Sequence, residues 1–278
     1  MTTPLTQAID LDAYFRRIGF TASARPDLET LATLHRLHPQ AIAFENLDPL
    51  LGVPVPLDEA ALQGKLVRAG RGGYCYEHNL LFMHVLRALG FAVRGLGARV
   101  QYGAPEGVVT PRAHMLLRVD LDGRRHIADV GFGGMTLTAP LELDQDGEQA
   151  TPHEPCRLVR SGEDFVLQAK IGPSWQALYR FDLQEQFQPD YEITNWYQST
   201  CPDSPFTRSL MAARAVPGVR YALRNNELSV HVRDKASERR RLRSAAEMRD
   251  VMAGTLGIEL RHSDPLDALF TRLTAVAA

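Results

Sequence analysis

The sequence predicts an α+β protein in which a helical N-terminal third precedes a run of short antiparallel strands. Between residues 10 and 90, apolar residues recur at helical spacing, between aspartates that suit helix starts and glycines that suit helix ends. From residue 91 to about 183, the apolar residues alternate or are β-branched, and Asp-Gly and Ser-Gly-Glu-Asp turns separate the runs. A third pattern begins near Asn195 and combines a loop, a hairpin and a terminal helix.

Four helices are expected in the first third. Asp10 or Asp12 suits the cap of a helix over 11–20, Asp27 that of a helix over 28–47, and Asp58 that of a helix ending at Gly70. A fourth helix is expected to start near Cys75 and to stop near Gly90. In the second helix, Leu28, Leu31 and Leu34 or Leu37 form the expected apolar stripe, and His35 and His38 are expected to face solvent or to cap its end.

Strands are expected at 92–102, 114–121, 124–132, 156–161, 164–171 and 175–183, enough for an antiparallel barrel or sandwich. The later residues predict a hairpin turning at Asn225-Asn226 and a helix from Ser244 to Leu256. The basic run 238–243 ("ERRRLR") is interpreted as a solvated turn or helix start, with a phosphate contact as the alternative.

Composition narrows the class of protein. With 45% hydrophobic residues, 23% charged residues and a formal net charge of −2, the chain of 278 residues suits a globular protein rather than a nucleic-acid or membrane-surface binder. The start lacks a signal-like pattern, and no apolar run approaches the roughly 20 residues of a spanning helix. Three widely spaced cysteines argue against a disulfide scaffold. We therefore expect a soluble, cytoplasmic protein.

The stretch 71–79, "RGGYCYEHN", is the leading candidate for chemistry. A thiol at a helix N-terminus lies at the positive end of the helix dipole, which favours thiolate. Gly72 and Gly73 permit close approach by another chain segment or a ligand, and the expected occupant is a cofactor arm. Asn79 and Phe82 share the helix face of Cys75. The alternative interpretation is a buried structural cysteine.

A thiol nucleophile needs a base, and hairpin geometry selects one. Asp122-Gly123 predicts a two-residue loop, which places Leu116 opposite Asp129. His114 and Asp129 are then diagonal neighbours on one face, at roughly 7–8 Å between backbone positions. A three-residue loop would put them on opposite faces. The other face carries the expected core residues Met115, Leu117, Val119, Ala128 and Val130.

The other histidines and the glycine-rich loop are weaker candidates. His78 and His84 lie on the helix of the cysteine, where a residue three along seldom acts as base, and His126 suits a core or edge position. No Cys-x-x-Cys or His-Glu-x-x-His pattern occurs, so no metal site is expected. The loop Gly131-Phe132-Gly133-Gly134 lacks the spacing of nucleotide-binding motifs. It is either a turn or a run of backbone N–H groups that can lie against a phosphate or a pantetheine arm.

Several segments resemble the arylamine N-acetyltransferases in order and spacing. They are "FENLD" (44–48), "RGGYCYEHN" (71–79), "PRAHMLL" (111–117), "ADVGFGG" (128–134) and "NWYQSTCPDSPF" (195–206). Tyr76, where many members have Phe, and Cys201 depart from the family pattern without touching the candidate triad.

The resemblance implies three parts: a helical bundle over 1–88, a β-barrel over 89–194 and an α/β lid over 195–278. The first two together resemble the core of papain-like thiol enzymes. The resemblance also implies that Cys75 accepts an acyl group, that His114 is its base and that Asp129 orients the imidazole.

The implied reaction uses acetyl-CoA as co-substrate, with no bound cofactor, and a small aromatic amine, hydrazine or N-hydroxyarylamine as acceptor. Phe44, Phe132 and Phe206 are the implied substrate contacts, with ordinary core as the alternative, and 131–134 the implied CoA contact. Glu45 and Arg71 are expected to form a structural ion pair.

Three other functions are left open: a hydrolase, a CoA-independent amide synthase of the same fold, and a silent binding protein. The preferred amine, the acyl-chain range and the oligomeric state are open as well.

Overall fold

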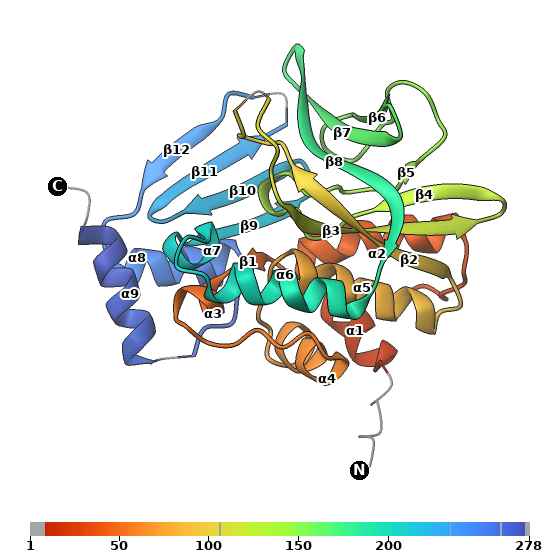
Figure 1. Cartoon of the computed structure of the whole chain (residues 1–278). Helices are drawn as coiled ribbons and strands as arrows, with labels where there is room; N and C mark the ends of the chain where they lie inside the picture. The colour runs from red at the N-terminus through yellow and green to blue at the C-terminus, as the bar shows by residue number, and fades with distance from the viewer. Residues whose placement is uncertain (1–8, 106, 234, 262, 276–278) are drawn as a thin grey trace.

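The computed structural model describes residues 9–275 except 106, 234 and 262. Helices near the N-terminus lie beneath a seven-stranded antiparallel sheet, and a five-stranded antiparallel sheet lies beside it with the C-terminal helices (Figure 1). The larger sheet curls into a nearly closed barrel. The predicted α+β class is confirmed, with its helical N-terminal region and antiparallel barrel.

The N-terminal helices begin at their predicted caps, but the predicted helix over 28–47 ends at residue 41, and residues 44–45 form the strand β1 instead. They are α1 (Leu11–Ile18), α2 (Leu28–Ala41), α3 (Leu47–Leu50), α4 (Glu59–Leu62) continued by the π-helical η1 (Gln63–Arg68), and α5 (Cys75–Ala88). The side chains of Asp10, Asp27 and Asp58 each accept a hydrogen bond from a backbone N–H of the first turn, which confirms these caps. Gly70 and Gly90 follow helix ends with positive φ angles of 65° and 89°.

The barrel contains every strand predicted between residues 92 and 186. Its strands are β2 (Ala92–Val100), β3 (Arg112–Leu121), β4 (Arg124–Ala128), β5 (Leu141–Glu142), β6 (Cys156–Ser161), β7 (Asp164–Ile171) and β8 (Ser174–Gln186). They pair in the order β5-β4-β3-β2-β8-β7-β6. The short 3-10 helix η2 (Gly133–Met135) follows β4, and β5 was not predicted.

The predicted register of the β3–β4 hairpin is confirmed. Leu117 pairs with Ala128 and Val119 with His126, as a two-residue loop requires. Asp122 and Gly123 both have positive φ, at 50° and 76°, the conformation that a tight hairpin turn demands. The expected core residues of this hairpin are all buried in the cluster shared with α5 (Met115, Leu117, Val119, Ala128 and Val130). Strand β4 ends at Ala128, one residue before Asp129.

The smaller sheet pairs in the order β1-β9-β10-β11-β12. Together with its helices it forms the C-terminal region, which also includes β1 from the first part of the chain. Its elements are β1 (Phe44–Glu45), α6 (Gln188–Thr200), α7 (Pro205–Arg208), β9 (Met211–Val216), β10 (Val219–Arg224), β11 (Glu227–Val232), β12 (Glu238–Arg241), α8 (Ala245–Asp250) with the π-helical η3 (Val251–Thr255), and α9 (Asp264–Ala275). The hairpin at Asn225-Asn226 and the helix capped by Ser244 are confirmed. Helices α3, α6, α7 and α9 were not predicted.

The interpretation of residues 238–243 as a turn or helix start is wrong. Residues 238–241 form the edge strand β12, because their backbone pairs with β11 from Glu227 to Val230. The four side chains of this strand stay exposed, so its polar composition is compatible with an edge position.

Two elements connect regions that the predicted boundaries separate. Helix α6 runs through residues 194 and 195, and β1, from the first part of the chain, pairs with β9. In Figure 1, α6 passes in front of α5 and below the smaller sheet. The division at 88 and 194 remains a prediction.

The expected solvent positions of His35 and His38 are wrong, because both side chains are fully buried. The buried face of α2 includes Leu31, Leu34 and these two rings, whereas Leu28 is 48% exposed. Both imidazoles pack edge-on against Phe82 of α5. The helix is therefore rotated about its axis relative to the predicted leucine stripe, since α5 covers the histidine side.

A buried hydrogen-bonded chain connects Tyr14, His38, His78 and the carbonyl of Ala43. Nε2 of His78 donates to the Ala43 oxygen over 3.2 Å, so Nδ1 of His78 accepts from Nε2 of His38 over 2.9 Å. Nδ1 of His38 then accepts from the Tyr14 hydroxyl, also at 2.9 Å. Both rings are neutral in this chain, and burial lowers the pKa of His78 to about 4 and that of His38 in the same direction.

Gly72 allows close approach of the Ala43–Glu45 segment, and Gly73 that of the Glu77 side chain, rather than of a cofactor arm. A Cβ on Gly72 would lie 2.0 Å from the Ala43 carbonyl oxygen, and Glu45 N donates to Gly73 O over 2.7 Å. Neither glycine lines the large cavity described below. The expected ion pair is present, with 2.7 Å between the Arg71 guanidinium and the Glu45 carboxylate.

Replacing Gly72 with Ala should therefore destabilise the protein by about 1–3 kcal/mol, the usual cost of overpacking. Gly64→Ala is the matched control, because a Cβ there meets nothing within 4 Å and the residue lies in a helical stretch. That control should be neutral or more stable by about 0.5–1 kcal/mol. Denaturant unfolding followed by circular dichroism measures both, and equal stability of the two variants would contradict the contact.

The buried histidines predict that stability falls with acid. A histidine whose folded pKa lies below the unfolded value of about 6.5 contributes stability above that pH, and the contribution is lost as pH falls towards the folded pKa. His78 is such a group, with a pKa of about 4. Between pH 6.5 and 5, the free energy of unfolding of His78→Gln should fall less steeply than that of the wild type, by about 1 kcal/mol per pH unit. Parallel slopes in urea titrations would contradict a neutral buried His78.

Candidate active site

Cys75 is the first residue of α5 and is 4% exposed. The Tyr74 backbone N–H donates to the Glu77 carboxylate over 3.0 Å, so an acidic side chain of the first turn folds back to the helix start. The Cys75 sulfur lies 3.9 Å from the carbonyl oxygen of Ala113, the neighbour of His114. The helix thus presents its first thiol to the beginning of β3.

His114 and Asp129 form a buried pair beside this thiol. Nε2 of His114 lies 2.7 Å from Oδ2 of Asp129, which leaves Nδ1 as the ring nitrogen available to Cys75. The side chains are 3% and 0% exposed. Burial alone lowers the pKa of His114, but the charge and hydrogen bond of Asp129, together with the contact with Cys75, outweigh it and raise the pKa to about 10. The arrangement favours an imidazolium next to the sulfur.

The Asp129 carboxylate is held by more than the imidazole. Oδ1 accepts from the side-chain amide of Asn79 and from the backbone N–H of Gly131, each at 2.9 Å. Burial raises the pKa of Asp129, yet the charge of His114 and these hydrogen bonds reverse the effect and leave it lowered. Asn79 was predicted to share the helix face of Cys75, and the structure shows what it does there.

His35 also reaches this region, and the sequence analysis missed it. The backbone N–H of Asp129 donates to Nε2 of His35 over 3.0 Å, in a fully buried contact. The residues are 94 positions apart, and no local spacing relates them. A second residue missed is Tyr179 of β8, whose ring centroid lies 5.0 Å from that of His114.

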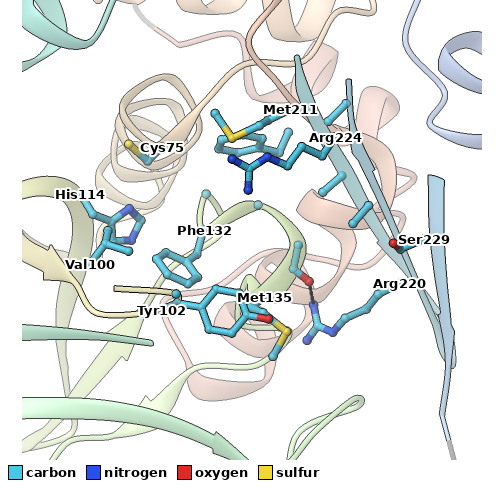
Figure 2. A pocket seen from close by; sticks show the side chains of 18 of the residues that line it. Cys75, Val100, Tyr102, His114, Phe132, Met135, Met211, Arg220, Arg224 and Ser229 are labelled. Atoms are coloured by element: carbon cyan, nitrogen blue, oxygen red, sulfur yellow. Dashed lines mark hydrogen bonds between the residues drawn. The ribbon is translucent and has the colours of Figure 1, made fainter. Parts of the chain in front are cut away.

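A cavity of about 1450 Å³ opens beside these residues. Cys75, His114 and all of 131–134 line it, as do Phe44, Phe132 and Phe206, so every implied substrate and CoA contact borders one space. The Phe132 ring meets His114 edge-on, with centroids 4.9 Å apart. Figure 2 shows Cys75 and His114 on one side of the cavity and Arg220 and Ser229 on the other.

Two of the loop glycines are required by the protein itself. A Cβ on Gly131 would lie 3.0 Å from the Cys75 Cα and 2.9 Å from the Asn79 amide nitrogen. Gly133 has a φ of 72°, which favours glycine. The loop therefore packs directly against the first turn of α5, and its other face borders the cavity.

The far wall of the cavity is polar and cationic. Arg220 of β10 is tied to Glu154 by a 2.7 Å ion pair and donates to the Thr136 carbonyl, which anchors the smaller sheet to the loop after Asp129. Arg224 and Met211 lie between the two ends of the cavity (Figure 2). Further cationic side chains that line the cavity are Lys170, Arg233 and Lys235.

Neither a metal-binding cluster nor a helix able to span a membrane is found in the described part of the chain. No cluster of three His, Cys, Asp or Glu side chains there is placed to bind a metal ion. No helix among residues 9–275, apart from the three positions left out, is long and apolar enough to cross a membrane.

Known proteins resemble this chain over almost its whole length. The family described as N-acetyltransferase matches residues 27–264. A curated arylamine N-acetyltransferase of Mycobacterium bovis is 43% identical over 275 residues, covering 98% of this chain and 97% of its own. An arylamine N-acetyltransferase / N-hydroxyarylamine O-acetyltransferase of Salmonella typhimurium is 46% identical over 207 residues, covering 74% and 73%.

Solved structures show the same likeness as the sequence comparisons. The Mycobacterium marinum arylamine N-acetyltransferase in complex with CoA superposes with a TM-score of 0.91 at 41% identity, covering 95% of this chain and 99% of its own. Together with the matched family and the curated relatives, this likeness shows that the chain belongs to the arylamine N-acetyltransferase family.

Proposed function

We propose that this protein transfers an acetyl group from acetyl-CoA to an arylamine, arylhydrazine or N-hydroxyarylamine through an acetyl-Cys75 intermediate. The observation that carries the proposal is the buried His114–Asp129 pair, 2.7 Å apart, beside a thiol on the wall of a large cavity. The relatives' names supply the acceptor class, and the CoA complex of a relative supports the donor.

In the first half-reaction, the Cys75 thiolate attacks the thioester carbonyl carbon of acetyl-CoA. A carbon–sulfur bond to Cys75 forms, and the carbonyl oxygen carries the negative charge of the tetrahedral intermediate. When the bond to the CoA sulfur breaks, the departing sulfur takes the proton of the His114 imidazolium. Acetyl-Cys75, neutral His114 and CoA with a free thiol result.

In the second half-reaction, the nitrogen of the acceptor attacks the acetyl carbon, or the oxygen does so for an N-hydroxyarylamine. Neutral His114 accepts the proton that the acceptor loses, and the bond to Cys75 breaks. The products are the acetylated acceptor and the original thiolate–imidazolium pair. Each turn of the cycle thus returns the proton to His114.

The surrounding residues have supporting roles in this mechanism. Asp129 binds Nε2 of His114 and so keeps Nδ1 towards Cys75. The backbone N–H of Cys75, in the first turn of α5, is suited to stabilise the oxyanion. Phe44, Phe132 and Phe206 would form the slot for the aromatic ring of the acceptor.

The length of the cavity suits a donor with an apolar reactive end and a charged tail. Residues 131–134 border the space next to Cys75 and are proposed to contact the pantetheine arm. The side chains of Arg224, Lys170 and Lys235, which line the cavity, would attract the phosphates. In this proposal residues 195–278 act as a lid, 1–88 supply the nucleophile, 89–194 supply its base, and the enzyme acts on foreign amines in the cytoplasm.

The acetyl-enzyme itself is the direct test. Incubation with acetyl-CoA alone should add one acetyl group to the intact protein, detected by mass spectrometry, and an added arylamine should remove it. Cys75→Ala should show no adduct and no acetyl transfer, whereas Cys201→Ala should behave as the wild type. Turnover near the wild-type rate in Cys75→Ala would exclude the proposed nucleophile, and a wild type that releases no CoA would favour an amide synthase or hydrolase.

Asp129→Asn should reduce acetyl transfer by about 10⁴-fold, because the amide stabilises the wrong imidazole tautomer and no imidazolium. The pKa of His114 should also fall from its value of about 10, since Asp129 provides the largest contribution that raises it. Histidine-labelled NMR titration measures this pKa. Asp120→Asn, on the same hairpin but paired with Arg118, is the matched control and should change neither quantity. A fully active Asp129→Asn would require another partner for His114.

A further inference from the structure

Residues 129–131 follow the end of β4, and the backbone N–H of each donates a hydrogen bond to a side chain. The N–H of Asp129 donates to His35 Nε2 at 3.0 Å, that of Val130 to Asn79 Oδ1 at 3.1 Å, and that of Gly131 to Asp129 Oδ1 at 2.9 Å. Strand pairing cannot hold these residues, because the last pair of β4 with β3 is Ala128 with Leu117. The position of the Asp129 backbone therefore depends on helices α2 and α5.

Burying the His35 imidazole costs free energy that the packing of the ring alone does not explain. Because Nε2 accepts the Asp129 N–H, the proton of the neutral ring is on Nδ1. That Nδ1 is buried and reaches nothing beyond the backbone of His35 itself. Leaving such a donor unpaired costs about 1–3 kcal/mol, which an apolar side chain in the same place would avoid. The stability of the helix packing therefore gives no reason for a histidine here.

We infer that His35 is a positioning residue for the Cys75–His114–Asp129 site: its Nε2 holds the Asp129 backbone so that the carboxylate meets His114. This inference rests on the roles proposed above. His35 contacts no substrate and acts only through Asp129. It couples the helical part of the chain to the barrel at the residue that orients the imidazole, so a small displacement there changes the alignment of His114 with the thiol.

Two variants of similar size separate hydrogen bonding from packing. Gln and Met are both long, unbranched and good helix formers, but only Gln has an acceptor for the Asp129 N–H. We expect His35→Gln to form acetyl-Cys75 within about threefold of the wild-type rate. His35→Met should be about 10- to 100-fold slower. This is the usual loss when a group that orients a metal-binding side chain is removed, and His35 acts on Asp129 in the same indirect way. The NMR pKa of His114 should fall in the Met variant alone.

His38→Met is the matched control, because His38 lies one turn further along α2, is equally buried and packs on the same Phe82 ring. Its hydrogen bonds go to Tyr14 and His78 and not to the triad. It should lose thermal stability to an extent comparable with His35→Met while keeping the wild-type rate of acylation, measured well below the melting temperature.

Equal acylation rates and His114 pKa values in folded His35→Met and in the wild type would overturn the inference, as would equal rate losses at positions 35 and 38. If His35→Met does not fold, His35→Asn takes its place in the experiment. The Asn side chain is one methylene shorter than that of Gln, so its amide cannot reach the Asp129 N–H. A wild type without NMR coupling across the Asp129 N–H and His35 Nε2 would also overturn the inference.

Alkylation of Cys75 by iodoacetamide is measured in parallel, so that the inference and the proposed function can fail separately. If no acetyl adduct forms in the wild type, the proposed function fails. The alkylation rates and the His114 titration still decide the role of His35.

Discussion

The contact on which the site depends is the buried hydrogen bond between His114 and Asp129. A carboxylate without solvent is unfavourable unless charge and donors surround it, and here His114, Asn79 and Gly131 supply them. The same pairing raises the pKa of the imidazole against the effect of burial. Since a neighbouring thiol meets a cation rather than a neutral ring, the chemistry proposed for Cys75 follows from how Asp129 is enclosed.

That enclosure is built by parts of the chain that are far apart in sequence. The barrel contributes the two strands of one hairpin, but β4 ends before Asp129, and the helices α2 and α5 hold the residues that follow. Gly131 then packs on the backbone of Cys75, so the loop, the carboxylate and the thiol share one contact region. The site is therefore a property of the interface between helices and barrel.

Much of this could be predicted because local rules decide it. Asp122 and Gly123 alone determine the hairpin register, and the register puts His114 and Asp129 on one face. Aspartate caps likewise placed α1, α2 and α4. His35 escaped prediction because its orientation depends on how α2 rotates against α5, which no local spacing reveals. Residues 238–241 became a strand for a similar reason, since only pairing with β11 makes them one.

The pairing of β1 with β9 has a consequence for synthesis on the ribosome. Phe44 and Glu45 emerge early, whereas their partners Ala213 and Ala212 follow only after the entire barrel has been translated. Until then, one edge of the segment that packs on Gly72 and bridges to Gly73 remains open. A nascent chain therefore completes the surroundings of the Cys75 thiol late, and a prematurely terminated product would carry this cysteine without its finished cavity wall.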